Sequence, residues 1–232
     1  ILEAIYEPIF SDNSHGFRPN RSCHTALYQI KSTCRGTNWV IEGDITGCFD
    51  HIDHEILLKI LSKKIDDGRF LELIRKFLKA GYLEFNQKYN SLSGTPQGGI
   101  ISPTLANMTL DGLQSLVQKA VKPHWEPADT KYGRKWIEPK INLVRYADDF
   151  IVTAKDKETI ETVLLPLIRQ FMAERGLMLS EEKTKVTHVS EGFDFLGFNI
   201  REYKSNGKLL TKPSKDAMKN FCDKVRTKIK SN

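Results

Sequence analysis

The sequence contains little of what marks a secreted, zinc-binding or membrane-spanning protein. Its 232 residues include only four cysteines, and no two of them have the Cys-x-x-Cys spacing of a zinc site. A disulfide framework is not expected either, because disulfide-stabilised domains are short and rich in cysteine. No signal peptide is recognisable, and apolar runs such as residues 163–165 are far shorter than a membrane span. The composition therefore favours a reducing, intracellular environment.

Internal repeats, low-complexity tracts and a Gly-Lys-Ser/Thr phosphate loop are also absent from the sequence. With 40% hydrophobic residues, the chain can bury a core as one large domain or as two closely packed subdomains. Its net charge of +6 is uneven, because residues 201–232 hold ten Lys or Arg and three acidic residues, a net charge of +7. This asymmetry indicates a polyanion such as nucleic acid at that end, although a solvated helix face gives the same pattern.

Two adjacent carboxylates, Asp148 and Asp149, lie between short runs rich in β-branched and aromatic residues. This pattern predicts a β-hairpin over residues 141–154 with the acids at its bend. Adjacent like charges that lose water need a compensating cation, and Mg²⁺ takes several oxygen ligands. A third acid is expected from elsewhere, and Asp44 is the candidate because an apolar strand over residues 39–45 ends there. The alternative is that the pair only decorates a turn, as Asp often does.

The first part of the chain predicts helices around a turn-rich loop. Residues 1–10 are apolar and helix-like, and Ser22 is expected to cap a helix that Gly36 ends. Between them, Arg18 and Arg21 are placed to hold phosphate at the start of that helix. Two packing helices follow, over residues 56–65 and 73–78.

A histidine pair and a glycine-rich loop follow the strand that ends at Asp44. We expect His51 and His54, at the start of a helix, to be solvated rather than bound to metal. Residues 82–92 predict a polar hairpin. The loop after it holds Gln97 between a proline and a glycine, and Ser102 is the expected N-cap of one helix reaching to Val117. The loop is similar to a nucleotide cradle, whereas a plain loop-to-helix junction explains only the capping.

The second half predicts alternating helices and strands. Residues 122–140 lack periodicity and are interpreted as a surface insertion. Asp156 is expected to cap a helix that is kinked at Pro166. Strands are predicted at 177–179 and 186–189, and a hairpin from residue 193 turns at Asn206 and Gly207. The last helix has an apolar stripe without an obvious partner, so we expect the sequence to be part of a longer protein.

Several of these features occur together in the order found in reverse transcriptases. The segments His15–Ser22 and Gly94–Pro103 resemble those of group II intron-encoded reverse transcriptases, or maturases. The resemblance covers nearly the whole chain. The motifs that carry it are Asp44 with Phe49, Thr95-Pro96-Gln97-Gly98, Tyr146-Ala147-Asp148-Asp149, Lys183 before a strand, and Phe195-Leu196-Gly197.

The resemblance implies an α+β fold, the right-hand polymerase fold, with an antiparallel palm sheet packed on helices and with partial fingers. Residues 1–38 would be partial fingers and 39–200 the palm. Finger elements would lie at about 66–95 and a surface insertion at about 122–140. Residues 201–232 would form the end of the palm and the root of the thumb.

The resemblance also implies roles for individual residues. Asp44, Asp148 and Asp149 would be the catalytic residues and the ligands of two Mg²⁺ ions that promote attack of a primer 3′-hydroxyl on a dNTP. Phe49 would be a steric gate against ribose, and Gln97 and Gly98 would contact the nucleotide. Lys183 is a candidate general acid. The expected contacts to primer and template are Arg18, Arg21, Tyr146, Ala147, Phe195, Leu196 and Gly197.

The implied partners are an RNA template, a DNA primer, dNTP and a group II intron RNA, in a cytoplasmic ribonucleoprotein without a membrane. The implied function is RNA-directed DNA polymerisation, in a parent protein that also assists intron splicing and mobility. Three alternatives remain at this point: a non-catalytic RNA-binding maturase, an RNA-dependent RNA polymerase, and a reverse transcriptase of a CRISPR or phage-defence system. The oligomeric state is open.

Overall fold

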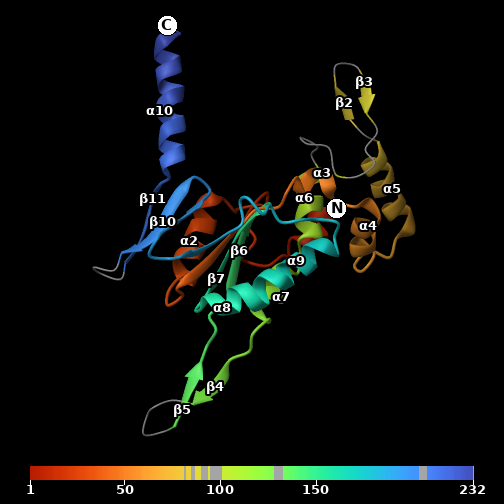
Figure 1. Cartoon of the computed structure of the whole chain (residues 1–232). Helices are drawn as coiled ribbons and strands as arrows, with labels where there is room; N and C mark the ends of the chain where they lie inside the picture. Colours follow the sequence, from red (N-terminus) through yellow and green to blue (C-terminus); the bar gives the residue numbers. More distant parts are fainter. Residues whose placement is uncertain are drawn as a thin grey trace.

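The computed structural model describes residues 1–80, 82–84, 87–89, 94, 101–127, 133–203 and 208–231. Its centre is a four-stranded antiparallel sheet with the strand order β6, β7, β1, β8 (Figure 1). The predicted hairpin with Asp148 and Asp149 at its bend is confirmed as the pair β6–β7, and β1 lies directly beside β7. The strands are β1 (Trp39–Gly43), β6 (Asn142–Tyr146), β7 (Asp149–Ala154) and β8 (Lys185–His188).

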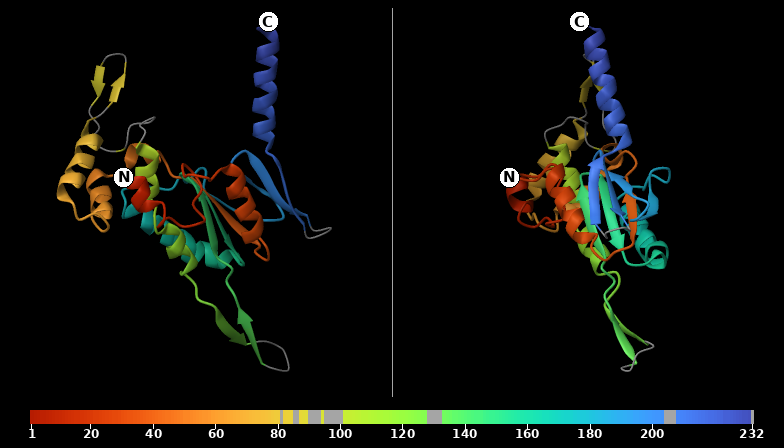
Figure 2. Two further views of the ribbon diagram at one scale, coloured as in Figure 1. Left: turned by 180° about the vertical axis from the view of Figure 1, so that it is seen from behind. Right: turned by 90° about the vertical axis from the view of Figure 1, so that its left-hand side faces the viewer.

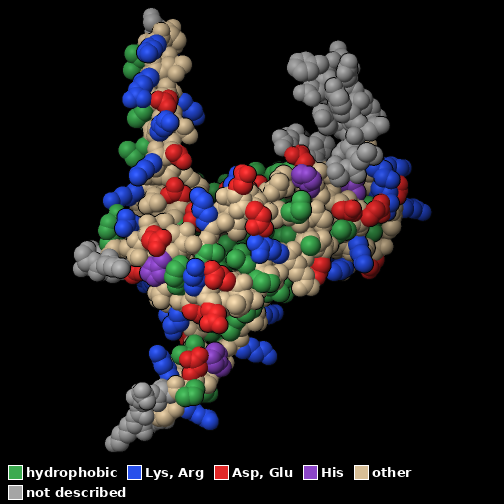
Figure 3. Space-filling view, in the orientation of Figure 1, with side chains coloured by type: hydrophobic (Ala, Val, Ile, Leu, Met, Phe, Trp, Pro, Cys, Tyr) green, Lys and Arg blue, Asp and Glu red, His purple; other side chains and the backbone are tan. Residues whose placement is uncertain are grey.

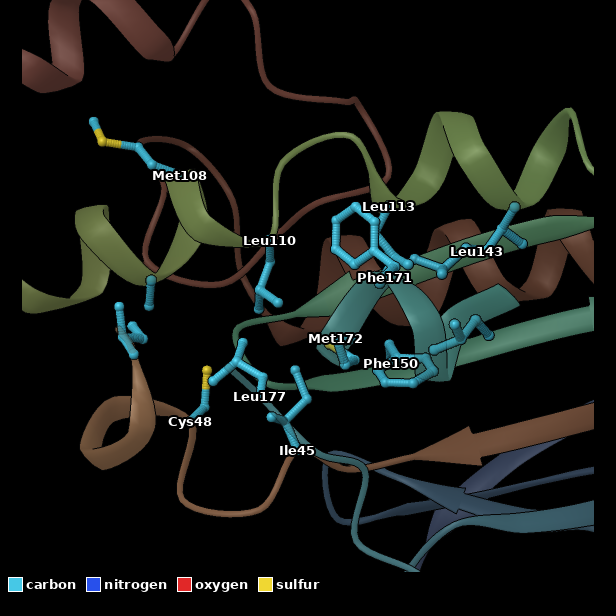
Figure 4. Packing of buried hydrophobic residues seen from close by; sticks show 14 of the residues in the cluster. Ile45, Cys48, Met108, Leu110, Leu113, Leu143, Phe150, Phe171, Met172 and Leu177 are labelled. Atoms are coloured by element: carbon cyan, nitrogen blue, oxygen red, sulfur yellow. The ribbon is translucent and has the colours of Figure 1, made fainter. Parts of the chain in front are cut away.

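Both faces of this sheet are covered, and the inner strand β7 is buried at every position after Asp149. Side chains of a strand alternate between the two faces. On β7, Phe150 therefore packs toward the helices behind the sheet, while Ile151 joins a second cluster on the other face. Figure 4 shows Phe150 near Leu113, Phe171 and Met172. The helices on this face are α6 (Ser102–Thr109), α7 (Leu113–Gln118) and α9 (Leu165–Ala173).

The opposite face is covered by helix α2 (Cys23–Thr33) and by a small second sheet. This sheet has the strand order β11, β10, β9. Glu42 of β1 ties this small sheet to the central sheet, because its carboxylate accepts a hydrogen bond from the backbone N–H of Asp194 (3.1 Å). Within the central sheet, the same carboxylate accepts a hydrogen bond from the hydroxyl of Thr187 (3.0 Å). The strands are β9 (Phe193–Phe195), β10 (Phe198–Tyr203) and β11 (Lys208–Pro213).

Three segments extend away from this body. Helix α10 (Lys215–Lys230) begins at a Ser214 N-cap and has no buried residue along its length (Figure 2). Two hairpins also project, β2 (Tyr82–Glu84) with β3 (Gln87–Tyr89), and β4 (His124–Pro127) with β5 (Arg134–Ile137). The remaining helices are α1 (Leu2–Tyr6), α3 (Cys48–His51), α4 (His54–Leu61), α5 (Gly68–Lys79) and α8 (Lys157–Thr159), with the π-helical turn η1 (Ile160–Leu164).

Most elements lie where the sequence predicts them, with local differences. The N-caps at Ser22 and Asp156 are confirmed. The helix predicted from Ser102 to Val117 is two helices, because the chain turns at Gly112 with a left-handed φ of 89°. Ser102 is the first residue of α6 rather than its N-cap.

Two further segments differ in kind from the prediction. The surface insertion contains the paired strands β4 and β5, which its lack of periodicity concealed. At the kink expected at Pro166 the structure has a π-helical turn that ends two residues before the proline, which supplies no N–H for a regular helical bond. The predicted turn at Asn206 and Gly207 lies outside the described residues. None of the helices in the described part of the chain has both the length and the apolar character that crossing a membrane requires.

Candidate active site

Asp44 and Asp149 meet because neighbouring strands end at the same edge of the sheet. Gly43, the last residue of β1, is paired with Phe150, the second residue of β7. A Cβ atom at Gly43 would lie 2.1 Å from the Phe150 ring, so only glycine lets the ring cross the strand here. In the residue after Gly43, the carbonyl of Asp44 accepts a hydrogen bond from the Ser180 N–H (2.9 Å), which fixes the end of β1. The two carboxylates thus come from positions far apart in sequence.

Asp148 lies in the tight turn of the β6–β7 hairpin. The last pair of the ladder is Tyr146 with Asp149, so that Ala147 and Asp148 form the turn. Ala147 has a φ of 56°, a left-handed conformation that is uncommon for a residue with a side chain. The neighbouring backbone is closely packed on it, because a Cβ atom at Gly16 would lie 2.3 Å from the Ala147 nitrogen. The turn is therefore held in one conformation from outside.

The electrostatics of the three aspartates reflect their crowding. Burial, together with the negative charges of Asp148 and Asp44, raises the pKa of Asp149 to about 6. Burial likewise raises the pKa of Asp148, with a smaller contribution from Asp44. Carboxylates that share a small, partly dry space repel one another unless a cation joins them.

One cation of the chain already faces this group. The Lys183 ammonium lies 3.0 Å from Asp44 Oδ2, and the Lys183 side chain is 69% exposed whereas that of Asp44 is 18% exposed. The hydrogen bond to Asp44 raises the pKa of Lys183. In the part of the chain that the structure describes, no three Asp, Glu, His or Cys side chains are grouped closely enough to form a ready metal site. The arrangement supplies carboxylate oxygens, the ligands that hard divalent cations prefer, with one of them paired to a lysine.

A shallow recess of about 160 Å³ joins the aspartates to the β9–β10 turn. Its lining includes Asp44, Asp149 and Lys183 as well as Phe195 and Leu196. Leu196 and the glycine after it form the turn with left-handed φ angles of 51° and 79°. Two of the predicted primer contacts, Phe195 and Leu196, therefore border the same recess as two of the predicted catalytic residues, Asp44 and Asp149. Gly197 also accepts a hydrogen bond from the Ser214 N–H (2.9 Å), which links the recess to the start of α10.

Phe49 lies on helix α3, which follows Asp44. Its half-buried ring forms a T-shaped pair with the ring of Phe17, with centroids 6.2 Å apart and an interplanar angle of 77°. Close by, the N–H of Gly94 donates to the carbonyl of Ile52 (2.8 Å). The predicted nucleotide contacts Gln97 and Gly98 lie outside the described residues.

The prediction that His54 is solvated is wrong. His54 is buried, and its Nε2 atom donates to the Gly94 carbonyl at 2.6 Å. Gly94 has a φ of 78°, and a Cβ atom there would lie 2.5 Å from the Phe49 carbonyl. His54 thus fixes the start of the loop that carries the nucleotide motif. His51 is exposed, as expected, and its Nδ1 atom lies 2.9 Å from the Gly47 carbonyl.

Arg18 has partners that differ from the predicted template phosphate. It is 8% exposed, and its guanidinium forms an ion pair with Glu7 (2.9 Å) and donates to the carbonyls of Ser11 (2.6 Å) and Ser14 (2.7 Å). A guanidinium that is buried and fully engaged in this way stabilises its own loop. Arg21 is paired with Asp12 at 2.8 Å and remains partly exposed.

Arg145 is the residue that sequence reasoning missed. It is 1% exposed, and its guanidinium donates to the Asn107 side chain (2.8 Å), the Ala147 carbonyl (2.9 Å) and the Ser14 hydroxyl (2.8 Å). Asn107 in turn donates to the Gly16 carbonyl at 2.9 Å. Burial lowers the pKa of Arg145 to about 10, which leaves it charged at neutral pH. An arginine next to the acidic motif, in a strand with apolar neighbours, was the available signal.

Comparison with known proteins agrees with this geometry. Residues 1–200 match the family described as "Reverse transcriptase (RNA-dependent DNA polymerase)". The group II intron-encoded protein LtrA of Lactococcus lactis subsp. cremoris is 40% identical over 250 aligned residues, which cover 88% of this chain and 42% of that protein. The protein YkfC of Escherichia coli is 34% identical, covering 86% of this chain and 58% of its own length.

Solved structures give the same fold. The telomerase of Candida albicans, in complex with a fragment of telomeric RNA, superposes with a TM-score of 0.64 at 12% identity and covers 92% of this chain and 36% of its own. The predicted right-hand polymerase fold, of α+β class, is therefore confirmed. This chain spans less than half of the length of LtrA. Because the family match extends over 200 of the 232 residues, the chain belongs to the reverse transcriptase family, and among the members of that family it is similar to the group II intron-encoded proteins.

Proposed function

We propose that this chain carries the polymerase centre of an RNA-directed DNA polymerase. The reaction is the transfer of a nucleotide from a dNTP to the 3′-hydroxyl of a primer that is paired with an RNA template. One observation carries the proposal: in a member of the reverse transcriptase family, Asp44 and Asp149 converge on one recess from distant parts of the sequence, with Asp148 in the adjoining turn.

The three aspartates are the proposed ligands of two Mg²⁺ ions. The chemistry of these carboxylates supports a cation site, because burial and mutual repulsion raise the pKa of Asp149 to about 6. The Lys183 ammonium, paired with Asp44, partly compensates their negative charge. Bound Mg²⁺ would lower the pKa of the primer hydroxyl and neutralise the triphosphate. Lys183 must leave Asp44 when the site fills, and it is then free to give a proton to the departing pyrophosphate.

The remaining residues bind and select the substrates. Phe49 is the proposed gate that excludes a ribose 2′-hydroxyl, and Gln97 with the Gly98 backbone contacts the incoming nucleotide. Tyr146 and Ala147 flank the primer end. Phe195, Leu196 and Gly197, in and beside the lining of the recess, grip the primer, and Arg21 faces the template.

The domain assignment belongs to the same proposal. Residues 1–38 are partial fingers, 39–200 the palm, and 201–232 the end of the palm and the root of the thumb. The biological partner is a group II intron RNA, in a ribonucleoprotein inside the cell, and the whole protein assists splicing and mobility of that intron.

Primer extension on an RNA template tests the proposal. The Asp148→Asn and Asp149→Asn double variant should lose extension, because neutral amides cannot bind the cations. The chain offers a matched control in another adjacent pair, Asp66 and Asp67, where the same double substitution keeps an N-cap for α5 and should leave extension unchanged. Full activity of the Asp148 and Asp149 variant would refute the assignment.

Sugar selection tests the gate separately. We expect Phe49→Ala to raise ribonucleotide incorporation relative to deoxyribonucleotide incorporation, since the space for a 2′-hydroxyl opens. An unchanged ratio would remove Phe49 from this role, without bearing on the aspartates.

A further inference from the structure

The β4–β5 hairpin is a feature that nucleotide transfer does not use. It extends from the end of the central sheet opposite to the Asp148 turn, since it leads into the first residue of β6 whereas the turn follows the last (Figure 1). All residues of β4 and all but Ile137 of β5 are exposed. The two views of Figure 2 agree that it stands clear of the body.

Two tryptophans dominate this hairpin. Trp125 and Trp136 are directly opposite in the ladder, with ring centroids 5.2 Å apart, and they pair across the strands. Even so, they remain 60% and 44% exposed. A cross-strand aromatic pair stabilises an isolated hairpin, but this stabilisation alone does not explain why two large apolar side chains are exposed to water.

The hairpin also carries cations, one of them on the same face as the indoles. Arg134 is two residues before Trp136, and since side chains alternate along a strand, it lies on the same face of the hairpin as both indoles. Lys135 is exposed on the other face. In the described part of the chain, neither cation forms an ion pair with a carboxylate. Figure 3 shows Lys and Arg side chains beside hydrophobic ones along this hairpin.

The wider segment has the same character. Between residues 119 and 140 the sequence contains six Lys or Arg and three acidic residues. Exposed flat aromatic rings beside unpaired cations match a single-stranded nucleic acid, whose bases stack on aromatic side chains while its phosphates pair with Lys and Arg. A paired duplex offers phosphates but keeps its bases inside, so the indoles would gain nothing from it.

We propose that the β4–β5 hairpin is a second RNA-binding site, which takes an unpaired RNA segment by stacking its bases on Trp125 and Trp136 and holding its phosphates with Arg134 and Lys135. The choice of RNA rests on the proposed function, because an RNA-directed polymerase already has RNA as its partner. The site is distinct from the recess at the aspartates, because the two lie at opposite ends of β6.

Intrinsic fluorescence tests this site directly. The chain has three tryptophans, and Trp39→Phe leaves only the two indoles of the hairpin as reporters. We expect a 12-nucleotide single-stranded RNA to quench their emission in a saturable way, whereas blunt RNA duplex, DNA of the same sequence and anionic phosphatidylglycerol vesicles do so much less. Equal or stronger quenching by DNA or by vesicles would overturn the commitment to RNA.

Charge reversal tests the cations. In the same background, Arg134→Glu with Lys135→Glu should weaken binding of the RNA at least about 10-fold at 50 mM salt and lower the salt-dependence slope by about 1.4, the effect of losing two phosphate contacts to a single strand. Lys59→Glu with Lys63→Glu makes the same charge change at exposed positions of and beside α4 and should do neither. Near-ultraviolet circular dichroism of the indole pair reports whether the hairpin still folds.

The outcomes separate this inference from the polymerase proposal. Absence of quenching, or equal affinity of the two charge variants, would overturn the hairpin site even if the protein extends primers. Quenching that depends on Arg134 and Lys135 in a protein unable to extend primers would support the hairpin site and refute the polymerase proposal.

Discussion

Replacing Arg145 by methionine should be among the most damaging single changes in this protein. Methionine fits a buried, elongated space but cannot donate hydrogen bonds. The substitution would therefore leave the Asn107 side chain, the Ala147 carbonyl and the Ser14 hydroxyl without the donor that now contacts them. The first two contacts use the same guanidinium nitrogen, so both are lost together.

The expected loss follows from opposing effects. Hydrogen bonds to a charged group contribute roughly 1.5–3 kcal/mol each, so three contacts set a gross loss of about 5–9 kcal/mol. Removing the guanidinium also removes the cost of burying a charge, which lowers the net effect. We expect the free energy of unfolding to fall by about 3–5 kcal/mol, a large part of the roughly 5–15 kcal/mol of a typical domain.

Urea denaturation measures this change. The control is Arg226→Met, because Arg226 is 70% exposed on α10 and its pair with Asp223 should contribute little. A double-mutant cycle with Asn107→Ala should give a coupling energy of about 0.5–3 kcal/mol, as expected for residues in one network. Additive effects, or a loss below about 1 kcal/mol for Arg145→Met, would refute the reasoning.

The same variant has a consequence for catalysis. Arg145 holds the carbonyl of Ala147, the residue before Asp148, so its loss should displace the acidic turn. A displacement of about 1 Å at a catalytic group can lower the rate by about 100-fold. Primer extension below the unfolding temperature should therefore show a reduced kcat with a nearly unchanged KM for dNTP. Arg145→Lys keeps the charge and should recover part of the activity.

Two further predictions concern the aspartates in the absence of metal. With EDTA present, Asp149→Asn should raise the free energy of unfolding at pH 7.5 by about 1–3 kcal/mol, because the folded state raises the pKa of Asp149 from 3.8 to about 6 and so disfavours its ionised form. This gain in stability should shrink as pH falls through 6, because the Asp149 carboxyl of the folded protein then takes up a proton. Urea titrations at several pH values measure it, and a gain that does not change with pH would count against the prediction. Lys183→Met should tighten the binding of Mn²⁺, because the ammonium that competes for Asp44 is removed. Electron paramagnetic resonance measures the Mn²⁺ affinity, and an unchanged affinity, or an equal change in the control Lys185→Met, would contradict this prediction.

Local patterns were enough to predict most elements and the identity of the acidic residues. The caps at Ser22 and Asp156 depend on residues within three positions of the helix start, and the β6–β7 hairpin depends on two β-rich runs around an acidic pair. These are short-range properties, which a sequence shows directly. The order of the motifs was enough to indicate the family.

Only the tertiary structure decided which groups meet and which of them are buried. Asp44 lies beside Asp149 because β1 inserts next to β7, a pairing over about a hundred residues. The sequence does not distinguish three buried polar residues from exposed ones: Arg18, His54 and Arg145. In the structure, all three fix loops around the aspartates. Their partners are mostly backbone carbonyls, which carry no sequence signal, and for this reason their roles could not be read from the chain alone.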